Sequence, residues 1–175
     1  MRNTKKNKIG ILGGTFDPAH KGHIAISKEA IKNLKISKVI WAITKKNPFK
    51  KKTFMSLKER IKYAKILNKN NPNIEVRYFE DKIKSSRTIN LINYIKKKNK
   101  NTDLFFLMGA DNLINFHKWY KWKLISEKSI ILVFDRNGYK IKSMKSATFK
   151  QLNKNRLAYI NFKKVNISSS QLRKI

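Results

Sequence analysis

The chain of 175 residues contains no cysteine, which excludes disulfides, thiolate metal sites and cysteine nucleophiles together. Long apolar runs are also missing, since no stretch approaches the ~20 residues of a membrane-spanning helix. The basic N-terminal residues precede an apolar stretch that is too short for the core of a signal peptide. We therefore expect a cytoplasmic protein with no membrane partner.

Acidic residues are scarce: 10 Asp and Glu stand against 42 Lys and Arg, and the formal net charge is +32 at pH 7. Such a surplus suits a protein that binds nucleic acid or anionic membranes. The alternative is compositional drift, because Lys, Asn and Ile are abundant throughout, as A/T-rich coding DNA would produce. The lysines are not gathered in one tail or helix and accompany no known nucleic-acid motif. We favour drift and expect no specific nucleic-acid partner.

Short apolar segments alternate with amphipathic helical patterns, which is typical of an α/β domain with a parallel sheet. The expected strands are Lys8–Leu12, Lys38–Ile43, Ile74–Arg77, Leu104–Met108, Ile130–Phe134 and Ala158–Phe162. The runs at 39–43 and 104–108 do not alternate with polar residues, which indicates strands that are covered on both faces. Length and pattern predict a single domain over residues 1–175.

Capping signals mark the helices between these strands. Ser56 and Glu59 have the spacing of a capping box, and apolar residues follow at helical spacing. Thr88 is a candidate cap for another helix. A third helical pattern begins near Ile24. The polar, lysine-rich stretch 139–156 is poorly patterned, so we expect a loop with some helix there.

The most informative segment is Gly13–His23, with the sequence GGTFDPAHKGH, which follows a short apolar strand and is interpreted as a glycine turn and the start of a helix. Glycines at 13 and 14 let the backbone approach a ligand closely. A helix N-terminus offers unpaired N–H groups and a positive dipole end. His20 and His23 would add side-chain donors on one side of the first turn. This arrangement fits nucleotide polyphosphate chemistry without a nucleophilic side chain.

The two histidines have other interpretations. A His-x-x-His pair also occurs by chance on helix surfaces and as half of a zinc site. Zinc would need further ligands, and His117 is the only other histidine. We therefore interpret His20 and His23 as phosphate contacts and expect no metal site made by the protein alone. Asp17 and Pro18 would shape the loop, because Pro18 fixes its own φ and biases Asp17 away from helix.

The segment GGTFDPAHKGH resembles the GGTFDPxHxGH signature of the nucleotidylyltransferase superfamily. Within that superfamily, the chain resembles the bacterial nicotinate-nucleotide adenylyltransferases, because MGADNL at 108–113 and FHKW at 116–119 are similar to segments of theirs. ISSSQLR at 167–173 resembles their ISSTxxR motif, with serine in place of threonine. The resemblance implies a Rossmann-like, doubly wound parallel sheet of the nucleotidylyltransferase type, in a single domain. It also implies that the strands ending at 12 and 108 are neighbours, with both following loops around one nucleotide.

The resemblance further implies a reaction: the adenylyl group of ATP passes to nicotinate mononucleotide, giving deamido-NAD and pyrophosphate in NAD biosynthesis. Mg²⁺ is expected to accompany ATP. A phosphate oxygen of the mononucleotide would be the nucleophile, so the enzyme supplies positioning and charge neutralisation. The alternatives are another superfamily member, with nicotinamide mononucleotide, phosphopantetheine or a CTP-dependent substrate, and a basic nucleic-acid-binding protein. An oligomer is compatible with the sequence but not specified by it.

Site residues follow from the same resemblance. Catalytic roles fall to His20, His23 and Arg173, whose guanidinium can hold two oxygens of the leaving pyrophosphate. The residues implied in binding ATP are Gly13, Gly14, Thr15, Phe16, His20, His23, Gly109, Asp111, Arg136, Ser168, Ser169 and Arg173. Those implied in binding nicotinate mononucleotide are Thr15, Phe16, Lys50, Thr88 and Trp119.

Some of these residues have equally simple structural interpretations. Phe16 can be a packing residue, and Trp119 can belong to an aromatic core stripe with Trp122 instead of stacking on the nicotinate ring. Lys50 lies in a run of lysines that can be a solvated surface. The serines before Arg173 can form an ordinary helix cap, with Arg173 as one of many surface cations.

Overall fold

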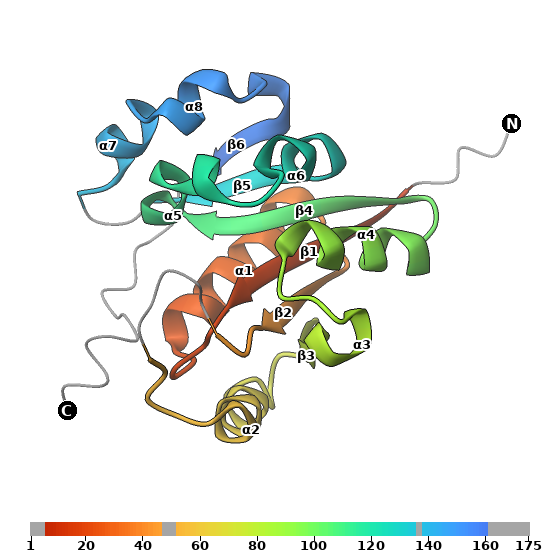
Figure 1. Cartoon of the computed structure of the whole chain (residues 1–175). Helices are drawn as coiled ribbons and strands as arrows, with labels where there is room; N and C mark the ends of the chain where they lie inside the picture. The colour runs from red at the N-terminus through yellow and green to blue at the C-terminus, as the bar shows by residue number, and fades with distance from the viewer. Residues whose placement is uncertain (1–5, 47–51, 136–137, 161–175) are drawn as a thin grey trace, which may run out of the picture.

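Six parallel strands form one sheet in the order β3-β2-β1-β4-β5-β6 (Figure 1). The structure, a computed structural model, describes residues 6–46, 52–135 and 138–160. The strands are β1 (Asn7–Gly14), β2 (Lys38–Ile43), β3 (Ile74–Tyr78), β4 (Thr102–Gly109), β5 (Ile130–Phe134) and β6 (Leu157–Ile160). This order is that of a doubly wound Rossmann sheet, which confirms the expected fold class.

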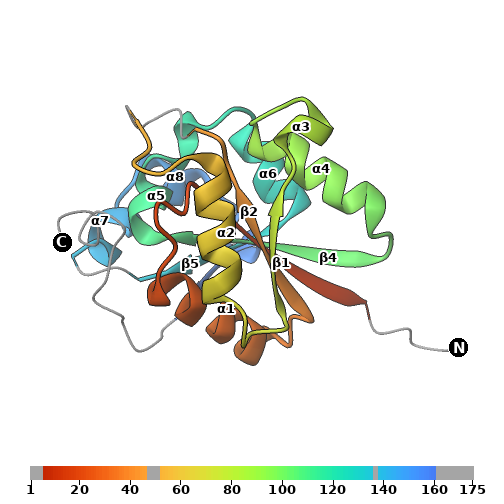
Figure 2. The same ribbon diagram turned by 90° about the horizontal axis from the view of Figure 1, so that it is seen from below.

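Helices cover both faces of the sheet. They are α1 (Lys21–Leu34), α2 (Leu57–Leu67), α3 (Glu80–Ile83), α4 (Thr88–Lys98), α5 (Ala110–Ile114), α6 (Trp122–Lys128), α7 (Lys140–Met144) and α8 (Ala147–Gln151), with 3₁₀ turns η1 (Phe116–Lys118) and η2 (Lys154–Arg156). Helices α1 and α2 pack on one face, while α4, α5 and α6 pack on the other, as Figures 1 and 2 show. None of the helices in the described segments is long and apolar enough to cross a bilayer.

Two buried clusters fill the space on the two sides of the sheet. Alternate residues of β1 divide between them, since Ile9 and Ile11 belong to one cluster and Leu12 to the other. The run at 104–108 divides in the same way. The lack of polar alternation at 104–108 therefore has the predicted cause, which is burial on both faces.

The glycines at the end of β1 depart from expectation. Gly13 and Gly14 are the last two residues of the strand and not part of a turn. They pair with Ala42 and Ile43, and the Thr44 N–H donates to the Gly14 carbonyl over 2.9 Å. Because this ladder with β2 keeps both glycines extended, the chain turns only after Gly14.

The start of α4 also differs from the prediction. Thr88 is the first residue of the helix, and Arg87 occupies the cap position without a side-chain capping bond. Ser85 lies just before this start, where its Oγ accepts hydrogen bonds from the Arg87 N–H at 3.1 Å and from the side-chain Nδ2 of Asn90 at 2.9 Å. The expected cap at Thr88 is therefore wrong.

Other local predictions are confirmed, with one segment more regular than expected. The Ser56–Glu59 capping box is present at the start of α2. The stretch 139–156 holds α7, α8 and η2, and it packs Phe149 and Leu152 against the core, which explains why it is more helical than its polar composition indicates. The last expected strand begins one residue early, at Leu157, and its residues beyond 160 lie outside the described part.

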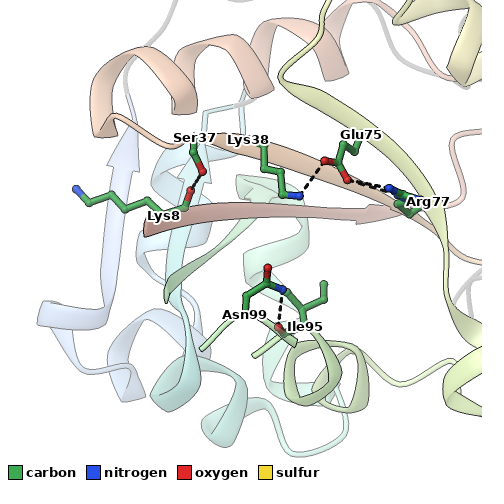
Figure 3. A network of polar contacts seen from close by, with 7 residues as sticks. All are labelled: Lys8, Ser37, Lys38, Glu75, Arg77, Ile95 and Asn99. Carbon is green, nitrogen blue, oxygen red and sulfur yellow. Dashed lines mark hydrogen bonds and ion pairs between the residues drawn. The ribbon is translucent and has the colours of Figure 1, made fainter. Parts of the chain in front are cut away.

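An ion-paired network fixes the edge strand β3 to β2 (Figure 3). Lys38 Nζ lies 2.8 Å from Glu75 Oε1, and Arg77 Nε lies 3.4 Å from Glu75 Oε2. The hydrogen bond from Lys38 holds the pKa of the Glu75 carboxyl below its usual value. Lys38 and Glu75 lie near the amino ends of their strands, away from the loops that follow the carboxyl ends.

Candidate active site

The strands β1 and β4 lie side by side, with Leu12 paired to Leu107. The strand order reverses direction here, because β2 and β3 follow on one side and β5 and β6 on the other. The crevice outside the carboxyl ends of such neighbours is where doubly wound proteins bind ligands. The structure therefore brings the segment 13–23 and the turn 109–111 to the same end of the sheet, as expected.

Two histidines cap the first helix. His20 is the N-cap of α1, and its Nδ1 accepts a hydrogen bond from the Gly22 N–H at 3.1 Å. The His20 N–H in turn donates to His23 Nδ1 at 3.1 Å. This is a capping box in which imidazoles replace the usual hydroxyl and carboxylate. Because both Nδ1 atoms accept, each neutral ring carries its hydrogen on Nε2 and is a donor there.

An aromatic stack supports the histidines. The Phe16 ring lies 5.0 Å from the Trp41 ring and 4.7 Å from the His23 ring, measured between centroids. Trp41 Nε1 donates to Ser27 Oγ at 2.8 Å, and Ser27 Oγ donates to the His23 carbonyl at 2.9 Å. Phe16 is 2% exposed, so its ring is a packing group. A contact between this residue and a substrate would have to come from its backbone.

Asp17 shapes the loop, as its sequence context predicts. Its Oδ2 accepts the Phe54 N–H at 2.6 Å and its Oδ1 accepts the Met55 N–H at 2.8 Å. The side chain is 4% exposed. Both carboxylate oxygens therefore tie the loop before α1 to the segment that enters α2.

The glycines leave room at the end of β1. A Cβ at Gly13 would lie 3.6 Å from the Phe106 ring, and one at Gly14 would lie 3.5 Å from the Phe16 ring, both ordinary van der Waals distances. Neither glycine has a positive φ. The packing and backbone of the protein thus do not require glycine at either position, whereas close approach of a ligand to the backbone would.

The second loop at this edge begins where β4 ends. Gly109 is the last residue of β4 and the N-cap of α5, and Asp111 lies half-buried in the first turn of that helix. The role of Gly109 and Asp111 in binding ATP stays a prediction. Five other predicted site residues lie outside the described residues, and their roles stay predictions: Lys50, Arg136, Ser168, Ser169 and Arg173.

Two of the residues predicted to bind nicotinate mononucleotide, Thr88 and Trp119, come from segments that touch. The Arg87 guanidinium carbon lies 3.8 Å from the centroid of the Tyr120 ring. This contact joins the start of α4 to the segment after η1. Thr88 and Trp119 are the chain neighbours of the contacting pair, so both belong to one region of the molecule.

Trp119 combines packing with partial exposure. Its ring meets those of Phe106 and Phe116 edge-on, at centroid distances of 6.0 and 5.3 Å. Trp122 meets Phe116 in the same manner at 5.9 Å. The aromatic stripe considered from the sequence therefore exists, and the half-buried Trp119 is part of it.

The described residues contain no cluster of side chains that could hold a metal ion. No group of three His, Cys, Asp or Glu side chains in residues 6–46, 52–135 and 138–160 is placed to hold a metal ion. His117 is engaged elsewhere, since its N–H donates to Thr148 Oγ1 at 3.1 Å and its Nδ1 lies 3.1 Å from the same oxygen. A zinc site built on His20 and His23 thus lacks a third ligand within these segments.

One buried residue at this edge has no distinguishing signal in the sequence. Arg60 of α2 is 1% exposed and donates to the Thr15 carbonyl of the loop before α1. With 42 Lys and Arg in the chain, neither its residue type nor its spacing sets it apart.

Comparison with known proteins agrees with this geometry. Residues 11–175 match the model of the cytidylyltransferase-like family. The "Probable nicotinate-nucleotide adenylyltransferase" of Pelagibacter ubique (strain HTCC1062) is 64% identical over 174 residues, covering 99% of this chain and 96% of that protein. The chain belongs to the nicotinate-nucleotide adenylyltransferase family. A relative of the same name in Agrobacterium fabrum is 37% identical and covers 74% of this chain and 70% of its own length.

Solved structures support the fold of this family. The Plasmodium falciparum nicotinic acid mononucleotide adenylyltransferase complexed with NaAD superimposes with a TM-score of 0.78, covering 96% of this chain and 83% of that chain. The same enzyme complexed with APC gives a TM-score of 0.76. Both are 22% identical to this chain, so the likeness concerns the arrangement of the sheet and helices.

Proposed function

We propose that the protein is a cytoplasmic enzyme of NAD biosynthesis that transfers the adenylyl group of ATP to nicotinate mononucleotide, giving deamido-NAD and pyrophosphate. The observation that carries this proposal is the histidine capping box at the sheet edge where β1 and β4 meet. It supplies two Nε2–H donors at the positive end of α1, a helix of 14 residues. Membership of the nicotinate-nucleotide adenylyltransferase family supports the same reaction.

The geometry suits an in-line displacement at the α-phosphorus of ATP. A phosphate oxygen of the mononucleotide attacks, the bond to the bridging oxygen breaks, and pyrophosphate leaves. Since the nucleophile belongs to the substrate, the protein must hold two anions in line and offset the charge on the leaving group. His20 and His23 provide donors for these phosphates, and their fixed orientation means that little reorganisation accompanies the reaction.

Mg²⁺ fits this site as a companion of ATP. The groups at the start of α1 are hydrogen-bond donors, which bind phosphate oxygens and not cations. We therefore assign Mg²⁺ to the ATP phosphates, with no all-protein cage. When bound there, it would neutralise charge on the leaving pyrophosphate.

The acceptor side rests on Thr88 and Trp119. Trp119 offers a partly exposed ring to the electron-poor nicotinate, and Thr88, at the start of α4, would help to hold its carboxylate. Lys50 is assigned to the acceptor phosphate, and Arg136, Ser168, Ser169 and Arg173 to ATP. These roles extend the proposal to residues outside the described segments.

A product assay with the purified full-length protein tests this function. ATP or CTP would be combined with nicotinate mononucleotide, nicotinamide mononucleotide or phosphopantetheine, and both pyrophosphate and the nucleotide product measured. We expect deamido-NAD from ATP and nicotinate mononucleotide to form with the highest kcat/KM. A preference for another pair would overturn the substrate assignment. Absence of any product, together with steeply salt-dependent DNA or RNA binding, would favour the basic nucleic-acid-binding alternative.

A further inference from the structure

A buried guanidinium joins three segments beneath the candidate phosphate loop. Arg60 Nη1 donates to the carbonyls of Thr15 at 2.6 Å and Thr44 at 2.8 Å. Nη2 donates to the Lys45 carbonyl at 2.9 Å, and Nε donates to the Met55 carbonyl at 3.2 Å. The side chain thereby ties the loop before α1, the end of β2 and the entry to α2 into one unit.

Two carboxylates offset the buried charge of Arg60. Asp17 binds the entry to α2, and Glu80 accepts the Lys45 N–H at 3.1 Å and the Thr44 hydroxyl. Burial lowers the pKa of the Arg60 guanidinium from its usual value, while the charges of Asp17 and Glu80 act in the opposite direction. An arginine remains charged under these conditions. The Arg60 guanidinium therefore has a carbonyl acceptor on each of the three segments that it joins.

The contact with Thr15 controls the direction of a neighbouring N–H. The Thr15–Phe16 peptide is trans, since the cis bond recorded in this loop is that between Asp17 and Pro18. In a planar trans peptide the C=O and the following N–H point in opposite directions. Because the Thr15 carbonyl points at Arg60, the Phe16 N–H points to the opposite side.

The backbone conformation of Phe16 is unfavourable and needs contacts from other residues to stabilise it. Its φ is +49°, in the left-handed region that residues with a Cβ seldom adopt. The ring is buried against Trp41 and His23, and the preceding carbonyl is held by Arg60. The buried ring and the guanidinium thus secure the residue from both ends.

We propose that Arg60 is a positioning residue, which orients the Thr15–Phe16 peptide so that the Phe16 N–H meets a phosphate oxygen of the bound substrates. The inference rests on the proposed function, in which the backbone of Thr15 and Phe16 contacts the nucleotides. Arg60 touches no substrate atom and acts only through this peptide.

A matched pair of variants separates positioning from general stability. The Arg156 guanidinium also donates hydrogen bonds to backbone carbonyls. These are the carbonyls of Ser126 at 3.0 Å and Glu127 at 2.6 Å, near the end of α6. Arg60→Lys and Arg156→Lys each keep the charge and lose the forked geometry. Arg60→Gln, which keeps two N–H donors, is a second variant in case the lysine destabilises the protein too far.

Kinetics of the full-length variants would be measured at a temperature where circular dichroism shows each of them folded, with rates expressed per folded molecule. We expect kcat/KM for Arg60→Lys to fall by about 10- to 100-fold, with KM for the substrates raised, because small misplacement of a contact group costs this much. Arg156→Lys should stay within about twofold of wild type, since its carbonyl partners lie away from the loop. Equal kinetics for the two variants would overturn the proposal.

The amide resonance of Phe16 gives a readout that does not depend on turnover. In nucleotide-free protein it should shift or broaden in Arg60→Lys and Arg60→Gln and stay unchanged in Arg156→Lys. An unchanged Phe16 resonance in the Arg60 variants would refute the positioning role. An inactive wild type with a displaced Phe16 resonance in those variants would instead refute the proposed reaction and the substrate contact, leaving only the hold of Arg60 on the peptide.

Discussion

The backbone N–H of His20 donates to Nδ1 of His23 over 3.1 Å, so the two histidines fix each other at the start of α1. The Gly22 N–H completes the arrangement by donating to His20 Nδ1. Each ring therefore uses Nδ1 in the cap, and the proposed function assigns Nε2 to the phosphates. The proposed function depends on this division, and it makes the two roles separable by substitution.

His20→Asn and His23→Gln should retain the fold and lose activity. Asparagine is a strong N-cap and glutamine serves at the third position of a capping box, so the backbone donors keep acceptors. The imidazole Nε2–H is lost in both. We expect the melting temperature to change little and kcat to fall by about 10²–10³-fold, the usual cost of one preorganised donor.

Alanine at the same positions is the control for this pair. His20→Ala should cost about 1 kcal/mol of stability in addition to the loss of turnover, because the cap is also removed. Thermal unfolding and steady-state kinetics measured on all variants provide the comparison. Near-normal kcat in His20→Asn or His23→Gln would rule out that histidine as a phosphate donor.

Asp17→Asn should weaken the fold. The carboxylate accepts two backbone N–H groups, from Phe54 and Met55, and an amide has only one acceptor oxygen. One buried N–H would then face an NH₂ group. We expect the free energy of unfolding in urea to fall by about 1–3 kcal/mol.

The matched control is Asp103→Asn. Asp103 lies at the amino end of β4, far from the loop that Asp17 holds. Its Oδ1 is 4.0 Å from Lys6 Nζ, and both side chains are exposed. Loss of that pair should cost less than about 0.5 kcal/mol. Equal stability losses for Asp17→Asn and Asp103→Asn would show that Asp17 does not hold the loop.

The lowered pKa of Glu75 should make the free energy of unfolding depend on pH. Its pKa is lowered in the folded protein, chiefly by the hydrogen bond from Lys38. A carboxyl with a depressed folded-state pKa stabilises the protein above its unfolded pKa, and this contribution disappears as pH falls through the folded value. Glu75→Gln should thus cost about 0.5–1 kcal/mol at pH 7 and less at pH 3. Urea unfolding of both proteins at the two pH values checks this, and a cost that does not change with pH would contradict the assigned ion pair.

Trp119→Phe should affect one substrate more than the other. Phenylalanine preserves an aromatic group against Phe116 but offers a smaller face to the nicotinate ring. We expect KM for nicotinate mononucleotide to rise by about 3- to 10-fold, the scale of one aromatic contact, with KM for ATP unchanged. Trp122→Phe, which also loses an indole packed edge-on to Phe116, is the control. A similar rise in both variants would assign Trp119 to packing alone.

Much of the sheet is encoded in local sequence pattern. The apolar runs of β2 and β5 coincide with the observed strands residue for residue. The adjacency of β1 and β4 is different, because it depends on the direction of a crossover that no local pattern records. Only the likeness of Gly13–His23 and Gly109–Asp111 to a known family implied that the two loops meet.

The failures have local physical causes. Gly13 and Gly14 suggest a turn, but pairing with β2 keeps them in the strand. Thr88 suggests a cap, but the helix already includes Thr88, and Arg87 takes the cap position without a side-chain capping bond. The mutual capping of the histidines is local, but histidine is not a standard residue of a capping box, so the sequence does not signal it. The burial of Arg60 is a tertiary feature, which its residue type does not indicate.

A crystal structure with a non-hydrolysable ATP analogue tests the central claim most directly. The account predicts Nε2 of both His20 and His23 within about 3 Å of phosphate oxygens, the distance of a hydrogen bond. It also predicts that Nδ1 of His20 still accepts the Gly22 N–H in the complex. A triphosphate bound away from the start of α1, or histidine rings turned so that Nδ1 faces it, would contradict the account.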